Sequence, residues 1–231
     1  MLPKIIFIFK LFVVLESYIC IFKNYSSLPD SIPIHLNFKG GIYKYLPRCS
    51  IIFFPIMMTI LFVVLNMLPK FDTFPHNYRK FQAEFYLLIL TIVSFLRYMC
   101  YIYIQLAYKE FNVLLELMPG AGIMFIILGF CIMRSKMNTN LGCNHAFGYT
   151  SNENWAIINK YFGLTFMIPW GIAIIGYIVK SVWFIVGGII TMIAGMILVN
   201  VYGSQQLSLL EKIFDMREEM ERLKEVWSHQ Y

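Results

Sequence analysis

Six long apolar blocks constrain this sequence more than any other feature. They run over about residues 5–22, 50–67, 85–107, 113–133, 162–179 and 182–202. A helix rises 1.5 Å per residue, so blocks of about 18 to 23 residues match a hydrocarbon core of about 30 Å. No block alternates apolar and polar residues as a transmembrane β-strand does. The sequence therefore predicts an all-α, polytopic membrane protein with six transmembrane helices.

The fourth block gives the weakest evidence of a membrane span among the six. Its uninterrupted apolar run, Pro119–Met133, is short for a membrane span, and we expect the helix to begin earlier, near Val113, and to include Glu116.

The amino-acid composition also indicates a membrane protein. Of the 231 residues, 59% are hydrophobic and 14% are charged, whereas soluble domains average about 45–50% apolar and about 25% charged residues. Both a soluble globular enzyme and a disordered chain are excluded on this ground.

Basic residues predict the orientation of the chain in the membrane. With the N-terminus inside, cytoplasmic segments hold eleven Lys and Arg residues and outer segments hold six, namely Lys23, Lys39, Lys44, Arg48, Lys109 and Lys180. Cytoplasmic loops are enriched in these residues, so we expect both termini to be cytoplasmic in a bacterial plasma membrane. Residues 23–49 then form an outer loop and residues 134–160 an inner loop. The net charge of +6 is interpreted as contact with anionic lipid, without direct nucleic-acid binding.

The last segment, residues 204–231, differs from the membrane domain formed by residues 1–203. Its apolar residues follow a 4-3-4-3-4 spacing typical of the a and d positions of a heptad: Leu209, Ile213, Met216, Met220, Leu223 and Trp227. The spacing predicts a cytoplasmic amphipathic helix. Two interpretations stay open: the stripe packs on the membrane surface or on loops of its own chain, or residues 209–227 dock a partner or a second copy.

Three ionisable residues interrupt the apolar blocks. Each costs about 2.5–3.5 kcal/mol at a bilayer centre on insertion scales. We expect Lys10 to extend toward the inner interface and Glu16 to lie near the outer end of the first span. Arg97 falls near the middle of the third span and requires a carboxylate partner, for which Glu16 and Glu116 are the candidates.

Catalytic and metal-binding signatures are missing from the sequence. The four histidines lie in different segments, the five cysteines show no CxxC spacing, and no P-loop, GxSxG, SxxK or HExxH motif occurs. We therefore expect no enzymatic activity, no catalytic residue, no metal and no cofactor. Recurrent glycines in the last three blocks predict close helix packing.

The two long loops carry motifs that resemble the SdpI family of bacterial membrane proteins. In the outer loop, the family's N-terminal domain of unknown function has the pattern P-x-H-x-N-x-x-G, which Pro33, His35, Asn37 and Gly40 match. After the second span, a family stretch rich in Asn and Tyr is matched by Pro75, Asn77, Tyr78, Phe81 and Tyr86. In the inner loop, two further family motifs are matched by Lys136, Asn138, Gly142, Glu153, Trp155 and Asn159. The resemblance covers the chain up to about residue 204.

The resemblance implies a non-enzymatic immunity protein that protects a cell from a secreted toxic peptide. Signalling members hold a cytoplasmic repressor at the membrane when the toxin engages them. By this comparison, the outer-loop motif residues would meet the peptide and the inner loop would face the regulator. One departure concerns the inner loop: the family's Arg-Thr is replaced by Asn144-His145, and its Pro-Trp by Ala146-Phe147. The guanidinium best suited to a charged partner is thus absent, and we include Asn144 and His145 among the inner-loop binding residues.

Two other functions stay open at this stage. A small transporter or transporter subunit would use Glu16 and Arg97 to line a polar path. A structural subunit of a larger membrane complex would dock through residues 209–227. The partners considered are therefore membrane lipids, a toxic peptide, a cytoplasmic repressor, another membrane subunit and a second copy of the chain.

Overall fold

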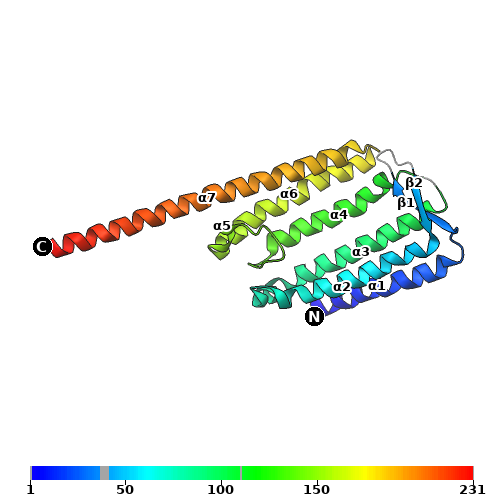
Figure 1. Ribbon diagram of the computed structural model, residues 1–231, viewed down its shortest axis with the longest axis horizontal. Coiled ribbons are helices and arrows are strands. Elements are labelled where there is room, and N and C mark those ends of the chain that lie inside the picture. The colour runs from blue at the N-terminus through cyan, green and yellow to red at the C-terminus, as the bar shows by residue number, and fades with distance from the viewer. Residues whose placement is uncertain (1, 37–41, 110, 231) are drawn as a thin grey trace.

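The computed structural model of the protein describes the backbone of residues 2–36, 42–109 and 111–230, and the side chains of residues 4–33, 44–109 and 111–222. Within this part, six helices are long and apolar enough to cross a membrane. They are α1 (Leu2–Tyr25), α2 (Phe53–Phe71), α3 (Gln82–Leu106), α4 (Val113–Arg134), α6 (Asn152–Ile178) and α7 (Trp183–Gln230). Their long axes run in nearly the same direction in one bundle (Figure 1). The expected fold class is confirmed, including a fourth helix that begins at Val113.

The outer loop contains a β-hairpin that the sequence analysis did not predict. Strands β1 (Ser31–Leu36) and β2 (Ile42–Pro47) pair antiparallel, with Ile32 opposite Leu46. The pairing is irregular between Pro33 and His35. Proline has no N–H to give to a ladder and is tolerated at such irregularities. The pairing of the two strands depends on contacts between residues far apart in the loop, which the sequence pattern does not show.

Short helical turns complete the two ends of the bundle. A 3-10 turn η1 (Arg48–Ile52) leads from the hairpin into α2, a second turn η2 (Pro75–Phe81) leads into α3, and α5 (Ala146–Tyr149) precedes α6. The hairpin lies at one end of the bundle, whereas η2 and α5 lie at the other (Figure 1). We call these the hairpin end and the loop end. The two loops singled out in the sequence therefore lie at opposite ends of the helices.

Two helices are longer than their apolar blocks predicted. Helix α6 begins at Asn152, about ten residues before the apolar block, because the Ser151 hydroxyl accepts a hydrogen bond from Asn154 N at 3.0 Å and caps the helix. Helix α6 therefore takes up the last third of the inner loop, and with α5 about half of this loop is helical. Helix α7 continues without interruption through residue 204, so the last segment extends the sixth span instead of forming a separate helix.

Close packing of α4 on α6 forms the most extensive helix contact. Gly129 and Gly163 face each other so closely that a Cβ on either residue would strike the backbone of the other. The rings of Phe125 and Trp170 stack nearby with centroids 4.5 Å apart. Small residues allow such approach between membrane helices. Gly129 is one of the recurrent glycines from which close helix packing was predicted.

Candidate functional site

An ion pair inside the membrane joins α1 to α3. Arg97 Nε lies 2.5 Å from Glu16 Oε2, and Arg97 Nη2 lies 2.9 Å from Glu16 Oε1. This two-point geometry satisfies both carboxylate oxygens at once. The expected Arg97–carboxylate pair is confirmed, and its partner is Glu16, not Glu116. The pair thus balances the charge of one ionisable residue of the first span against that of the third.

Lys10 does not extend to the interface as expected. Its side chain is fully buried, and its Nζ donates to Asn66 Oδ1 at 2.7 Å. The same nitrogen lies 3.9 Å from the ring centroid of Tyr86, with Phe7 and Phe62 also around it. Aromatic faces and an amide oxygen replace water for this ammonium. The snorkelling prediction was wrong because polar and aromatic partners on α2 and α3 face this position of α1.

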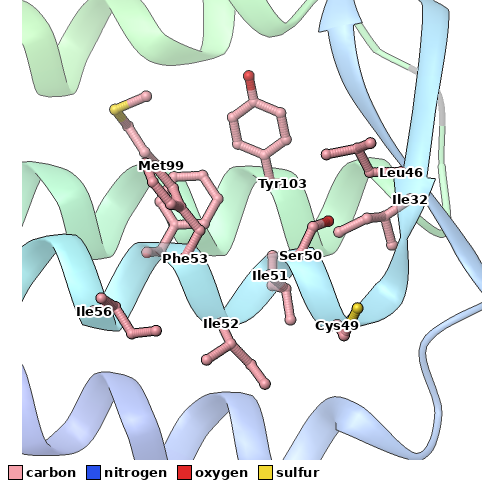
Figure 2. Close-up of a pocket in the computed structure, with 11 residues that line it drawn as sticks. Ile32, Leu46, Cys49, Ser50, Ile51, Ile52, Phe53, Ile56, Met99 and Tyr103 are labelled. Carbon is pink, nitrogen blue, oxygen red and sulfur yellow. The ribbon is translucent and has the colours of Figure 1, made fainter.

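At the hairpin end, an apolar pocket of about 780 Å³ opens between the hairpin, the start of α2 and α3. Its wall is made by Ile32, Leu46, Cys49, Ser50, Ile51, Ile52, Phe53, Phe54, Ile56, Met99 and Tyr103. Figure 2 shows Leu46 and Ile32 of the hairpin on one side and Met99 of α3 on the other. This volume falls in the range of small-ligand sites, which are concave and mainly apolar.

One polar atom in this pocket is unusual. The Ser50 hydroxyl oxygen is buried and has no hydrogen-bond partner among the described residues. In Figure 2 it points toward the space between Tyr103 and Leu46. A buried hydroxyl without a partner costs free energy, but this oxygen has less than 1 Å² of accessible surface and is closed to an occupant of the pocket in this conformation. The pocket was not foreseen from the sequence, because its residues come from five separate elements, β1, β2, η1, α2 and α3.

The outer-loop motif residues are only partly described. Pro33 is buried at the start of the hairpin. The backbone of His35 pairs with Lys44 in the ladder. The side chain of His35, as well as Asn37 and Gly40, lies outside the described residues.

At the loop end, the carboxylate of Asp72 organises the inner loop. Asp72 follows α2 directly and is buried. It accepts hydrogen bonds from Phe74 N at 2.8 Å, the Tyr78 hydroxyl at 2.8 Å, Thr139 N at 2.9 Å and Asn140 Nδ2 at 2.7 Å. Burial alone would raise the pKa of Asp72. The hydrogen bonds lower the pKa by more than burial raises it, so the pKa lies below its ordinary value. The carboxylate is therefore ionised and joins η2 to the inner loop.

The sequence analysis did not single out Asp72. An acidic residue directly after a span and before a stretch rich in Asn and Tyr was the available signal. Its importance becomes visible only when residues 72 and 139, distant in the chain, lie side by side.

Asn138 and Asn159 form the interior of the inner loop, and both are fully buried. Asn138 Oδ1 accepts from Leu141 N at 2.6 Å, and its Nδ2 donates to Leu141 O at 2.9 Å. Asn159 Oδ1 accepts from Cys143 N at 2.7 Å. These amides take the place of regular secondary structure for a loop whose backbone groups would otherwise lack partners.

Gly142 lies between these two amides with a φ of 124°, a conformation that side chains rarely adopt. A Cβ at this position would also strike the Asn159 side chain. Trp155, which is 1% exposed, donates from its indole nitrogen to Ser135 O at 3.1 Å. The motif residues Asn138, Gly142, Trp155 and Asn159 thus shape the loop from within.

The outer surface of the loop is formed by the other motif residues. Lys136, Asn144 and Glu153 are exposed. Beside them a cavity of about 280 Å³ is lined by Lys80, Ser135, Lys136, Asn152, Trp155 and Ala156. These exposed groups are the ones able to contact a partner at the loop end.

His145 connects the inner loop to α7. Its Nδ1 accepts a hydrogen bond from Phe147 N at 3.1 Å, and its Nε2 lies 3.2 Å from the Ser204 hydroxyl. The ring also packs on Gly203, where a Cβ would come within 2.8 Å of Nδ1. The sequence analysis proposed His145 as a binding residue, and the structure places it where α7 leaves the bundle.

The described residues contain no group of three or more His, Cys, Asp or Glu side chains arranged to hold a metal ion. All five cysteines are free thiols. Burial raises the pKa of Cys143 in the inner loop.

Comparison with known proteins gives one result for part of the chain. A family model described as "Domain of unknown function (DUF1648)" matches residues 11–59. The match runs from within α1, through the hairpin, into α2, and so includes most of the wall of the apolar pocket. Neither a curated protein nor a solved structure matches the chain. The protein is thus a polytopic helical membrane protein whose residues 11–59 are similar to this domain of unknown function.

Proposed function

We propose that this chain is an integral membrane immunity protein of the SdpI type, which protects its host cell from a secreted toxic peptide without a catalytic step. One observation carries the proposal: an apolar pocket beside a β-hairpin and an ordered polar loop occupy opposite ends of one helical bundle. The loop motifs that resemble the SdpI family and the domain match over residues 11–59 support the same assignment.

The orientation in this proposal has the loop end in the cytoplasm. Exposed basic residues gather there on the turns and helix ends: Lys70, Arg79, Lys80, Arg134, Lys136 and Lys160. Cytoplasmic segments of bacterial membrane proteins carry such an excess. The hairpin end then faces the outside, where a secreted peptide arrives.

The hairpin end offers an extended apolar peptide two kinds of contact. The sheet has two strands in the described part of the chain, so each strand keeps one edge without a neighbouring strand. Such edges accept an additional strand through backbone hydrogen bonds. The adjacent pocket can receive an apolar side chain of the peptide.

The loop end supplies a surface for a cytoplasmic regulator. Its exposed groups carry both signs of charge, with Lys136 and Glu153 as examples, while Asn144 offers an uncharged amide. Asn144 Nδ2 donates to Thr139 O in the segment that the Asp72 carboxylate holds, so this part of the surface is preorganised for binding. His145 adds a route from this surface to α7.

The structure gives less support to the alternative that the chain is a transporter. It requires Glu16 and Arg97 to meet a substrate in an aqueous path, yet each already satisfies the other through two hydrogen bonds. The alternative of a structural subunit rests on the exposed apolar residues of α7.

Protection from killing tests the proposal. A host strain lacking the chain is challenged with conditioned medium from its own species and with a panel of membrane-active peptides, and survival is counted with and without the wild-type gene. We expect the deletion to sensitise the cells and the gene to restore survival. Unchanged survival of the deletion strain against every challenge would refute an immunity function.

A pair of variants on β2 locates the contact. Leu46→Trp fills the pocket that Leu46 lines, whereas Tyr45→Trp places the same ring on the neighbouring exposed residue of the strand. Successive strand residues point to opposite faces. At equal membrane abundance, Leu46→Trp should lose protection and Tyr45→Trp should keep it. Equal protection by both variants would exclude the pocket as the peptide site.

A further inference from the structure

The end of α7 leaves the bundle and continues alone away from it (Figure 1). From Ser208 to Arg222 every side chain is exposed. Six of these residues are large and apolar. Four lie on one stripe, with exposed fractions of 51% for Leu209, 58% for Ile213, 57% for Met216 and 56% for Met220, and Leu210 and Phe214 lie beside it. An apolar stripe on a helix surrounded by water requires a covering surface.

The arrangement of side chains around this helix defines the stripe. Leu209 and Met216 occupy d positions of a heptad, and Ile213 and Met220 occupy a positions. All charged residues between 209 and 222 fall at the other five heptad positions: Glu211, Lys212, Asp215, Arg217, Glu218, Glu219, Glu221 and Arg222. The Glu218–Arg222 ion pair, at 3.9 Å, lies on the side away from the stripe. One narrow seam is therefore free of charge.

We propose that residues 206–227 pair with the same residues of a second copy in a parallel, two-stranded coiled coil. Two copies inserted in one membrane with the same orientation extend this helix in the same direction, so the pairing is parallel and in register. Ile at a and Leu at d favour two strands, and a polar residue at an a position, here Gln206, sets the register.

The structure disfavours the alternative that the stripe lies on the membrane surface. Residues 204–231 contain no Gly or Pro that would let the helix bend. Where the helix leaves the bundle, Gly203 packs against His145 and Ile158, and Ser204 lies within hydrogen-bonding distance of His145. These contacts fix the direction of α7 along the axis of the bundle, and so carry the stripe away from the lipid.

This proposal is independent of the immunity function. It assigns a second copy of the chain as the partner of α7 whether or not a peptide binds at the hairpin end. Pairing would bring two inner loops into one assembly, because each loop is joined to its own α7 through His145.

Cysteine cross-linking of the full-length protein in native membranes tests the pairing. The background variant is Cys49→Ser, which removes the native thiol that is exposed. Met216→Cys places a thiol in the seam, and Glu218→Cys places one on the opposite side of the same helix turn. Two equivalent thiols meet only in a parallel, in-register pair. Oxidation should give a covalent dimer with Met216→Cys and about tenfold less with Glu218→Cys. Equal cross-linking of both variants, or none, would overturn the proposal.

A second measurement does not depend on cross-linking. The mass of the detergent-solubilised protein is determined for the wild type, for the double variant Ile213→Glu/Met220→Glu and for the control Glu218→Gln. All three positions are exposed on a helix, so the fold should persist, as unchanged helical circular dichroism would verify. We expect a dimer for the wild type and the control, and a monomer for the double variant. A monomeric wild type, or a double variant that remains dimeric, would contradict pairing through this seam.

Discussion

Replacing Asp72 by asparagine tests whether one buried carboxylate holds the inner loop closed. Oδ1 of Asp72 accepts from Phe74 N, and Oδ2 accepts from Tyr78, Thr139 and Asn140 at 2.7–2.9 Å. An asparagine of the same shape that keeps its oxygen toward Phe74 would turn an NH₂ group toward the other three donors. Those donors then lose their acceptor.

The expected cost follows from these three donors. A buried donor without an acceptor costs about 1–3 kcal/mol. Thr139 and Asn140 are exposed and can bond to water, whereas the Tyr78 hydroxyl is buried, so this hydroxyl carries most of the loss. We expect the closed loop to be destabilised by about 2–4 kcal/mol in total. At 1.4 kcal/mol for each factor of ten, this corresponds to opening that is about 30- to 700-fold more frequent.

Amide hydrogen exchange of the purified protein in detergent measures this opening. Peptides covering residues 137–143 should exchange faster in Asp72→Asn, while peptides of the hairpin should not change. Asp30→Asn is the matched control, because the Asp30 side chain is 96% exposed and lies 3.6 Å from Arg48 at the other end of the bundle. Unchanged exchange over residues 137–143, or an equal increase in both variants, would show that the carboxylate does not hold the loop.

Three further predictions concern acid, backbone conformation and the intramembrane pair. Because the pKa of Asp72 lies below its ordinary value of about 3.9, its stabilisation is present above that value and is lost as the pH falls through the folded-state pKa. The melting temperature measured between pH 7 and 3 should therefore fall with decreasing pH in the wild type, and it should fall less in Asp72→Asn. Gly142→Ala should lower the free energy of unfolding by about 1–3 kcal/mol, because residue 142 has a positive φ. Gly171→Ala should leave the free energy of unfolding unchanged, because a Cβ there meets nothing within 4 Å. Equal melting temperatures of the two variants would contradict this reasoning. Arg97→Gln should lower the free energy of unfolding by about 3–5 kcal/mol, because it leaves the carboxylate of Glu16 unpaired. The double variant Glu16→Gln/Arg97→Gln should melt at a higher temperature than Arg97→Gln alone. If the double variant melts no higher, the lost ion pair is not the source of the destabilisation.

The membrane spans could be predicted from the sequence because a lipid bilayer imposes one length and one polarity on every helix that crosses it. Helix ends in water are less constrained. The polar first turns of α6 carry no hydropathy signal, so the helix was expected to begin about ten residues too late. For the same reason, nothing in the composition around residue 204 showed that α7 continues without interruption.

Partnerships between distant residues were harder to predict. The demand of Arg97 for a carboxylate was evident from its position, but the choice of Glu16 over Glu116 required the packing of α1 on α3. Lys10 was misplaced because its partners, Asn66 and Tyr86, come from two other helices. The pairing of the hairpin strands escaped prediction in the same way.

The inner-loop motif shows a related difficulty. Its conspicuous residues, Asn138, Gly142, Trp155 and Asn159, were grouped with exposed neighbours as one binding surface. The structure separates them: these four are engaged inside the loop, and Lys136, Asn144 and Glu153 remain accessible. A spacing pattern records both kinds of residue without distinguishing them.

Because α7 is one uninterrupted helix, a small tilt at its base produces a larger displacement at its tip. Its 48 residues form a rod about 72 Å long, which begins at the hairpin end and ends far outside the bundle (Figure 1). The part beyond residue 204 is about 40 Å long, so a tilt of about 5° at its base displaces its tip by about 3.5 Å. A slight adjustment of helix packing among the spans is thereby amplified into a displacement large enough to alter contacts at the tip.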